Sequence, residues 1–274
     1  MSASGAPAAG LSPEERAERA ASFGQAAAHY ERYRPGPPEA AVAWLIPRRV
    51  GTVVDVGAGT GALTRLLAAR AERVVAVEPD ERMRAVLGSV VPGVEVVEGR
   101  GEALPLPAGV ADALTASASW HWVDPVGGLR EAARVLKPGG IVGALWSGPD
   151  PDSAFMAQAR DLLTGSAADT LPGPAGTLRG AAARAPADQV LRIPEGLPFS
   201  EPENEVFRWD MGLTADDLVG LLGTMSWVIL MDEGARASLF ATVRRLLGEV
   251  LGVEGAVTVE VPFRCDTYRS RLLG

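Results

Sequence analysis

Short apolar runs alternate with helical patterns along the first half of the chain. Between residues 50 and 147, apolar positions recur at helical spacing over 61–70, 80–87 and 125–136. The segments between these helices are short and rich in valine and alanine, as in strands buried on both faces of a parallel sheet; they are 52–56, 74–77, 94–97, 113–117 and, after a turn at 138–140, 141–145. This alternation predicts βαβ units. We therefore expect an α/β core over about 50–147, with a Rossmann-like, doubly wound, mostly parallel sheet.

Helical segments flank this core on both sides. Before it, the pattern predicts one helix from Ser12 toward Tyr33 and a second over 38–46. After it, an Ala/Gly/Pro-rich connection at 165–190 separates further expected elements: helices over 153–163, from 214 and over 233–251, and strands over 206–209 and 257–263. Residues 1–11 have the composition of a disordered tail. We expect a single domain over 12–274.

Composition and charge exclude several classes of function. The 274 residues carry a formal net charge of −8, which disfavours binding to nucleic acid and to anionic membrane surfaces. One cysteine excludes an internal disulfide, and two histidines leave little material for a metal centre, so no metal is expected. No run of 18 apolar residues occurs, and the N-terminus lacks a secretory signal pattern. These features favour a cytoplasmic protein, monomeric or homodimeric, that acts on a small molecule.

A glycine-rich loop joins the first expected strand to the first core helix. Gly57, Gly59 and Gly61 allow a tight turn and close approach of a ligand to the helix N-terminus. Glu78 ends the next strand, 19 positions after Gly59, where a carboxylate can accept hydrogen bonds from ribose hydroxyls. This pattern indicates a nucleotide-like cofactor, but Gly57-x-Gly59-x-x-Ala62 also fits the dinucleotide fingerprint.

The acidic residue before the loop separates the rival cofactors. Asp55 lies at the buried end of the strand, where a carboxylate needs donors or a cation. A cofactor with an ammonium and a sulfonium group suits that position, whereas a pyrophosphate would be repelled. The alternative is that Asp55 simply caps backbone groups of the turn.

These motifs together resemble those of the class I S-adenosylmethionine (SAM)-dependent methyltransferases. VDVGAGTGALTRLL resembles the first family motif and VVAVEPDERM the ribose-binding second one. EGRGEALPLPAGVADALTASASWHWVD and EAARVLKPGGIVGAL resemble the later motifs, in order and at normal spacing. The chain is similar to the methyltransferase type 11, ubiquinone-biosynthesis-like group. SFGQAAAHYERYRPGPPEAA and VEVPFRCDTYRSR are similar to its trans-aconitate-methyltransferase-like subgroup.

The resemblance implies SAM as cofactor, S-adenosylhomocysteine as its product, and methylation of oxygen, nitrogen or carbon, for example in secondary metabolism. It implies a helical lid over 12–46 and a C-terminal helical insertion over 150–274 that caps the substrate. The implied cofactor-binding residues are Tyr33, Arg34, Asp55, Gly57, Ala58, Gly59, Glu78, Pro79, Met83, Gly101, Glu102 and Ser117. Arg100 departs from the Asp or Thr of many relatives, so an aspartate contact to adenine is absent here.

Two histidines are the candidates for a catalytic base. His121 follows the fourth strand at the edge where open α/β sheets bind ligands, and His29 lies on the N-terminal helix; either could instead have a structural role. Candidate walls of an apolar acceptor pocket, with core packing as the alternative, are Trp120, Trp122, Met225 and Trp227. Two other functions stay open: a SAM-fold protein that guides a non-methylating reaction, and an NAD(P)-dependent oxidoreductase.

Overall fold

The computed structural model describes residues 27–164, 189–252 and 256–274. The expected N-terminal tail, the first half of the expected N-terminal helix and most of the connection at 165–190 lie outside these residues. Among the described helices, none combines the length and the hydropathy that a membrane crossing requires.

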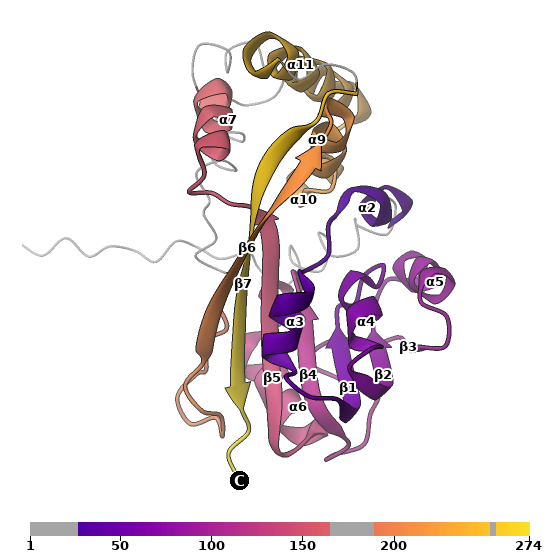
Figure 1. The fold of residues 1–274 in the computed structure, drawn as a ribbon. Coiled ribbons are helices and arrows are strands. Elements are labelled where there is room, and N and C mark those ends of the chain that lie inside the picture. The colour runs from indigo at the N-terminus through magenta and orange to yellow at the C-terminus, as the bar shows by residue number, and fades with distance from the viewer. Residues whose placement is uncertain (1–26, 165–188, 253–255) are drawn as a thin grey trace, which may run out of the picture.

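A seven-stranded sheet forms the centre of the molecule, in the order β3-β2-β1-β4-β5-β7-β6 (Figure 1). Neighbouring strands from β3 to β5 are parallel, and β7 is antiparallel to both of its neighbours. The first five strands are β1 (Val50–Val56), β2 (Ala71–Val77), β3 (Glu95–Val97), β4 (Ala111–Ser117) and β5 (Leu136–Pro149). The order reverses between β1 and β4, so a crevice is expected at their carboxyl ends.

Helices cover both faces of the parallel part because its strands are apolar on both sides. In β1, Val53 packs with α3 (Glu39–Leu45) and α4 (Ala62–Leu67). The next residue, Val54, points to the other face and packs with α6 (Pro125–Val135). Helix α5 (Glu81–Val90) lies beside β3 (Figure 1). Because side chains alternate between the two faces of a strand, one run of valines contributes to the hydrophobic core on each face of the sheet.

The two C-terminal strands extend beyond the parallel sheet and carry a second group of helices (Figure 1). Strand β6 (Glu203–Leu213) pairs along its whole length with β7 (Val259–Arg271). At their far end lie α9 (Ala215–Leu222), α10 (Ser226–Ile229) and α11 (Glu233–Leu251), with α7 (Ala154–Thr164) nearby and α2 (Ala27–Tyr33) between this group and the sheet. A capping box fixes the start of α9, since Thr214 and Asp217 satisfy each other's backbone N–H groups.

The predicted α/β architecture is confirmed, and the differences concern element limits. β6 and β7 are longer than the expected 206–209 and 257–263. No residue of β6 is fully buried, and the buried positions of β7 after Phe263 include the polar Thr267 and Ser270, so the apolar pattern is shorter than the strands. The turn expected at 138–140 is wrong: these residues belong to β5, where Gly139 has a φ of +76° and the register with β4 shifts. The short helix at Trp120–Trp122 and α10 were not predicted.

Candidate active site

A cavity of about 550 Å³ opens at the carboxyl ends of β1, β2 and β4, where the strand order reverses. We call it the large cavity. The residues that line it come from the glycine loop, the ends of β2 and β4, the segments after β3 and β4, and helices α2 and α5. They include Tyr30, Gly57, Gly59, Glu78, Pro79, Met83, Gly99, Gly101, Glu102, Ser117, Trp122 and Val123. Most of the predicted cofactor-binding residues therefore meet at one place.

The glycine loop has a backbone conformation that other residues adopt with strain. Gly57 and Gly59 have φ values of +63° and +57°. A Cβ on Gly57 would lie 2.5 Å from the Cβ of Ser119, whereas a Cβ on Gly59 would meet no protein atom within 4 Å. Gly57 thus lets β4 approach the loop, and Gly59 presents bare backbone to the cavity. These are the properties of a loop that receives a ligand at close range.

Glu78 is held rigidly at the end of β2. Its Oε2 accepts a hydrogen bond from the Gly59 N–H at 2.9 Å, and its Oε1 accepts one from the Asp80 N–H at 2.9 Å. The side chain is buried, and burial raises the pKa of the carboxyl while the two backbone donors oppose that rise. Each oxygen keeps a second lone pair, so Glu78 can still accept hydrogen bonds from two hydroxyl groups in the cavity.

A small hollow of about 40 Å³ adjoins the large cavity and shares Tyr30, Gly57 and Ser117 with it. Asp55 lines this hollow and is 1% exposed. Its Oδ2 accepts a 2.6 Å hydrogen bond from the Thr64 hydroxyl, but its Oδ1 has no hydrogen-bond partner in the described part of the chain. Burial, together with the smaller effect of the nearby Glu78, raises the pKa of the Asp55 carboxyl to about 7, although the hydrogen bond from Thr64 opposes the rise. A buried carboxylate oxygen without a partner suits a cationic ligand group.

The far wall of the large cavity is built around α5 and the segment after β3. Asp80 caps α5 by accepting hydrogen bonds from the Arg82 and Met83 N–H groups, which places the buried Met83 side chain against the cavity. Gly101 is packed so closely that an added Cβ would lie 2.8 Å from Val123. Glu102 accepts a hydrogen bond from the Asp124 N–H. A flat apolar group would fit between Met83 and this segment.

The end of β4 carries a strained residue that no sequence pattern revealed. Ala118 has a φ of +51°, the single non-glycine residue with positive φ among those described, and it lines both the large cavity and the small hollow. The neighbouring Ser119 hydroxyl donates a 2.7 Å hydrogen bond to the carbonyl of Val56. Left-handed backbone outside glycine is often found at functional sites, where the surrounding structure maintains it.

Both candidate histidines are engaged away from the cavities. The indole N–H of Trp146 donates a 3.1 Å hydrogen bond to Nδ1 of His121. Nδ1 carries the lone pair of the neutral ring, so this lone pair is already occupied and cannot take a proton from an acceptor. The His29 Nε2 lies 2.9 Å from the carbonyl oxygen of Gly220, so this nitrogen carries the proton and ties α2 to α9. Neither histidine lines the large cavity or the small hollow. This geometry favours a structural role for both histidines.

Other predicted residues are distributed differently from the expectation. Tyr33 does not line the large cavity or the small hollow, whereas Tyr30, which was not assigned a role, lines both. Trp122 lines the large cavity, but Trp120 is buried in the main core beneath it. Met225 packs in the helical group and lies 3.8 Å from the Arg34 guanidinium. The side chain of Trp227 lies outside the described residues.

Comparison with known proteins identifies the class of this site. Residues 54–144 match the family model of the methyltransferase domain. An uncharacterized methyltransferase of Mycobacterium tuberculosis is 33% identical over 257 residues, which cover 94% of this chain and 98% of that protein. The chain belongs to the class I SAM-dependent methyltransferases. The relative spans almost the whole chain, so the likeness includes the helical group as well as the core.

Two further proteins show which parts of the chain are similar to known methyltransferases. A protein from Anaeromyxobacter dehalogenans that is assigned as a type II methyltransferase shares the fold, with a TM-score of 0.62 and 24% identity over 88% of this chain and 99% of that one. The chloroplastic 2-methyl-6-phytyl-1,4-hydroquinone methyltransferase of Arabidopsis thaliana is 38% identical over 93 residues, or 32% of this chain and 28% of that protein. The methyltransferase activity follows from the family, and the acceptor does not.

Proposed function

We propose that the large cavity and the small hollow together bind SAM, and that this methyltransferase transfers the methyl group to a small-molecule acceptor. The observation that carries the proposal is the pairing of two buried carboxylates along one continuous site. Glu78 faces the large cavity with lone pairs for hydroxyl groups, and Asp55 faces the small hollow with an oxygen that lacks a partner.

The adenosine part of SAM fits the large cavity. Glu78 accepts hydrogen bonds from the two ribose hydroxyls, as a carboxylate at the end of a second strand does in nucleotide sites. The adenine ring packs between Pro79, Met83 and the segment from Gly99 to Glu102, where apolar side chains and bare backbone line the wall. Gly59 leaves the space that the ribose needs, since a Cβ there would point into open cavity.

The methionine part fits the small hollow. Its ammonium group can pair with Asp55, which lines this hollow with an oxygen that lacks a partner among the described residues. Tyr30 lines both spaces, so α2 covers the junction at which the sulfonium would lie. Ser117 and Ala118 form the opposite wall.

Methyl transfer requires positioning more than acid–base chemistry. The sulfonium group makes the methyl carbon electrophilic, and the acceptor attacks in line with the carbon–sulfur bond that breaks. The protein contributes by holding the two reactants at contact distance and by excluding water beneath α2. No histidine of the described chain faces the reacting position, so an acceptor that is already ionised suits this site best.

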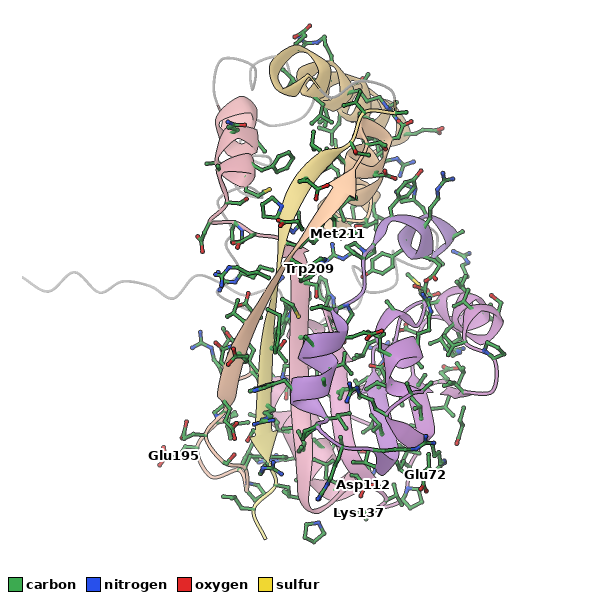
Figure 2. The ribbon with its side chains drawn as sticks, viewed as in Figure 1. Glu72, Asp112, Lys137, Glu195, Trp209 and Met211 are labelled. Carbon is green, nitrogen blue, oxygen red and sulfur yellow. The ribbon has the colours of Figure 1, made fainter. Side chains whose placement is uncertain are left out.

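The substitution Glu78→Ala tests the cofactor assignment. Loss of hydrogen bonds to a charged acceptor costs about 1.5–3 kcal/mol, which corresponds to a roughly 10- to 100-fold weaker affinity for S-adenosylhomocysteine in calorimetry. Glu72→Ala is the matched control, because Glu72 is exposed near the start of β2, at the end opposite to the one that Glu78 follows (Figure 2). Equal affinities of the two variants would refute the ribose assignment.

Product analysis tests the transfer itself. The enzyme is incubated with SAM and with acceptors that carry a carboxylate, a phenol or an amine, and products are examined by mass spectrometry. A gain in mass of one methylene group in any acceptor, absent without enzyme, is the expected result. Binding of SAM without a methylated product from any class would instead favour a non-methylating role.

A further inference from the structure

We infer that the methyl acceptor binds in a third space, between α2, β6 and α9, and that it is a small, mainly apolar molecule with an anionic group that pairs with Arg34. This space has a volume of about 260 Å³. We call it the acceptor hollow. The inference rests on the proposed function, because it assigns the partner of the cofactor that the two other spaces would hold.

The acceptor hollow adjoins the small hollow at a single pair of residues. Arg34 and Pro35, just after α2, line both spaces. A molecule in the acceptor hollow would therefore reach the methionine end of the cofactor past Arg34, and not the adenine end. Because the transferred methyl group belongs to the methionine end, this is the side from which an acceptor must approach.

One part of the wall of the acceptor hollow is apolar. Phe263 is fully buried and Leu221 nearly so, while Met211 and Leu213 of β6 contribute half-buried side chains. Figure 2 shows Met211 on the upper part of β6, beyond the parallel sheet and toward the helical group. At about 260 Å³ the hollow lies just below the range of about 300–1,000 Å³ that is common for ligand pockets, so it suits only a small acceptor.

The acceptor hollow depends on a specific contact between α2 and α9. A Cβ on Gly220 would lie 2.3 Å from the Tyr33 ring, so this glycine is needed for the ring to lie flat on α9. The bond from His29 to the Gly220 carbonyl fixes the same contact. Tyr33 thereby becomes a wall of the acceptor hollow. This explains why Tyr33 turns away from the cofactor spaces and gives His29 a positioning role.

The charges in the acceptor hollow leave one cation available. Asp217 is held ionised, since hydrogen bonds from Thr214 lower the pKa of its carboxyl, and Arg32 is close enough to compensate its charge. Arg34 donates to the carbonyl of Ser147 at 3.5 Å and to the sulfur of Met225 at 3.8 Å, both long contacts to uncharged groups. Within the described residues Arg34 has no carboxylate partner. A guanidinium placed this way can recognise an anion.

The test compares three probes that share a phenylalkyl body and end in an anionic, a neutral or a cationic group: phenylbutyrate, phenylbutanamide and phenylbutylamine. Each is titrated by calorimetry into enzyme saturated with S-adenosylhomocysteine. We expect phenylbutyrate to bind at least about tenfold more tightly than the amide, and the amine to bind most weakly. Arg34→Met should remove this preference, and Arg34→Lys should restore part of it. Arg130→Met, an exposed arginine on α6, should keep it.

A second pair of variants tests the location. Met211→Trp places an indole in the acceptor hollow and should abolish phenylbutyrate binding, whereas Asp210→Trp places the same group on the exposed face of β6 and should not. If Met211→Trp does not fold, as judged by its affinity for S-adenosylhomocysteine, Leu213→Phe replaces it. Equal binding of acid and amide, binding of neither, or full binding to the filled variants would each overturn the inference.

Failure of this inference is distinguishable from failure of the proposed function. The affinity for S-adenosylhomocysteine is measured first for every variant. Tight cofactor binding with no preference among the probes contradicts the acceptor assignment alone. An Arg34→Met enzyme that loses cofactor affinity while its probe preference persists would assign Arg34 to the cofactor carboxylate instead and would also overturn the inference. Absence of cofactor binding in the unaltered enzyme would contradict the proposed function itself.

Discussion

Asp55 makes the stability of this enzyme depend on pH in a direction that can be worked out. Its carboxyl is completely buried, one oxygen lacks a partner, and its pKa is raised from 3.8 to about 7. Because the folded pKa lies above the unfolded one, the folded state holds the proton more tightly. Stability is therefore greatest below the unfolded pKa and is lost as the pH rises through the folded pKa.

The size of this loss follows from the pKa change. Raising the pKa from 3.8 to about 7 corresponds to about 4 kcal/mol of lost stability at a pH above both values. About 2.5 kcal/mol of that is lost between pH 5 and pH 8, where the folded state gives up its proton. Asp55→Asn removes the titrating group and keeps an oxygen for the Thr64 hydroxyl, so the variant should not lose this amount.

Urea unfolding at pH 5, 6, 7 and 8 measures the effect. The unfolding free energy of Asp55→Asn minus that of the unaltered protein should rise with pH by about 2.5 kcal/mol across this range. Asp210→Asn, which changes an exposed aspartate of β6, controls for the loss of one charge and should show no such trend. A difference that stays constant with pH, or that falls, would refute the reasoning that burial controls this carboxyl.

Two further predictions concern close-packed glycines. Gly57→Ala should cost about 1–2 kcal/mol of stability for its positive φ and should also abolish cofactor binding, because its Cβ would collide with Ser119. Gly109→Ala is the control, because Gly109 has nearly the same φ but open space around it. Thermal unfolding should show a similar loss of stability in this variant, and calorimetry should show normal cofactor binding. Equal losses of cofactor affinity in both variants would refute the proposed clash with Ser119. Gly220→Ala should displace the Tyr33 ring, cost about 1–3 kcal/mol in urea unfolding and weaken phenylbutyrate binding more than S-adenosylhomocysteine binding. Unchanged probe affinity would show that Tyr33 is not a wall of the acceptor hollow.

The core of the fold could be predicted from the sequence because its determinants are local. A run such as 52–56 is apolar on both faces, which is stable only in a parallel sheet covered by helices, and the helical periods between the runs supply that cover. β6 and β7 were underestimated for the opposite reason. β6 is partly exposed over its whole length, and the buried positions that extend β7 include the polar Thr267 and Ser270, so the apolar pattern is shorter than the paired strands.

The cofactor spaces were largely determined by the sequence as well. Gly57, Gly59 and Glu78 lie at the ends of predicted strands, and parallel strands bring their carboxyl ends to one edge, so those residues meet whatever the rest of the chain does. Local pattern could not show that Ala118 is strained or that Asp55 keeps an oxygen without a partner, since both depend on atoms supplied by other strands.

The roles of the residues on α2 were decided by the tertiary structure alone. The sequence places His29, Tyr30, Tyr33 and Arg34 on one short segment, but which of them faces a ligand depends on how α2 is rotated about its axis. That rotation is fixed by Gly220, about 190 positions away, which accepts the His29 hydrogen bond and leaves room for the Tyr33 ring. A helix carries side chains on all sides, and only its packing partner selects the side that becomes buried.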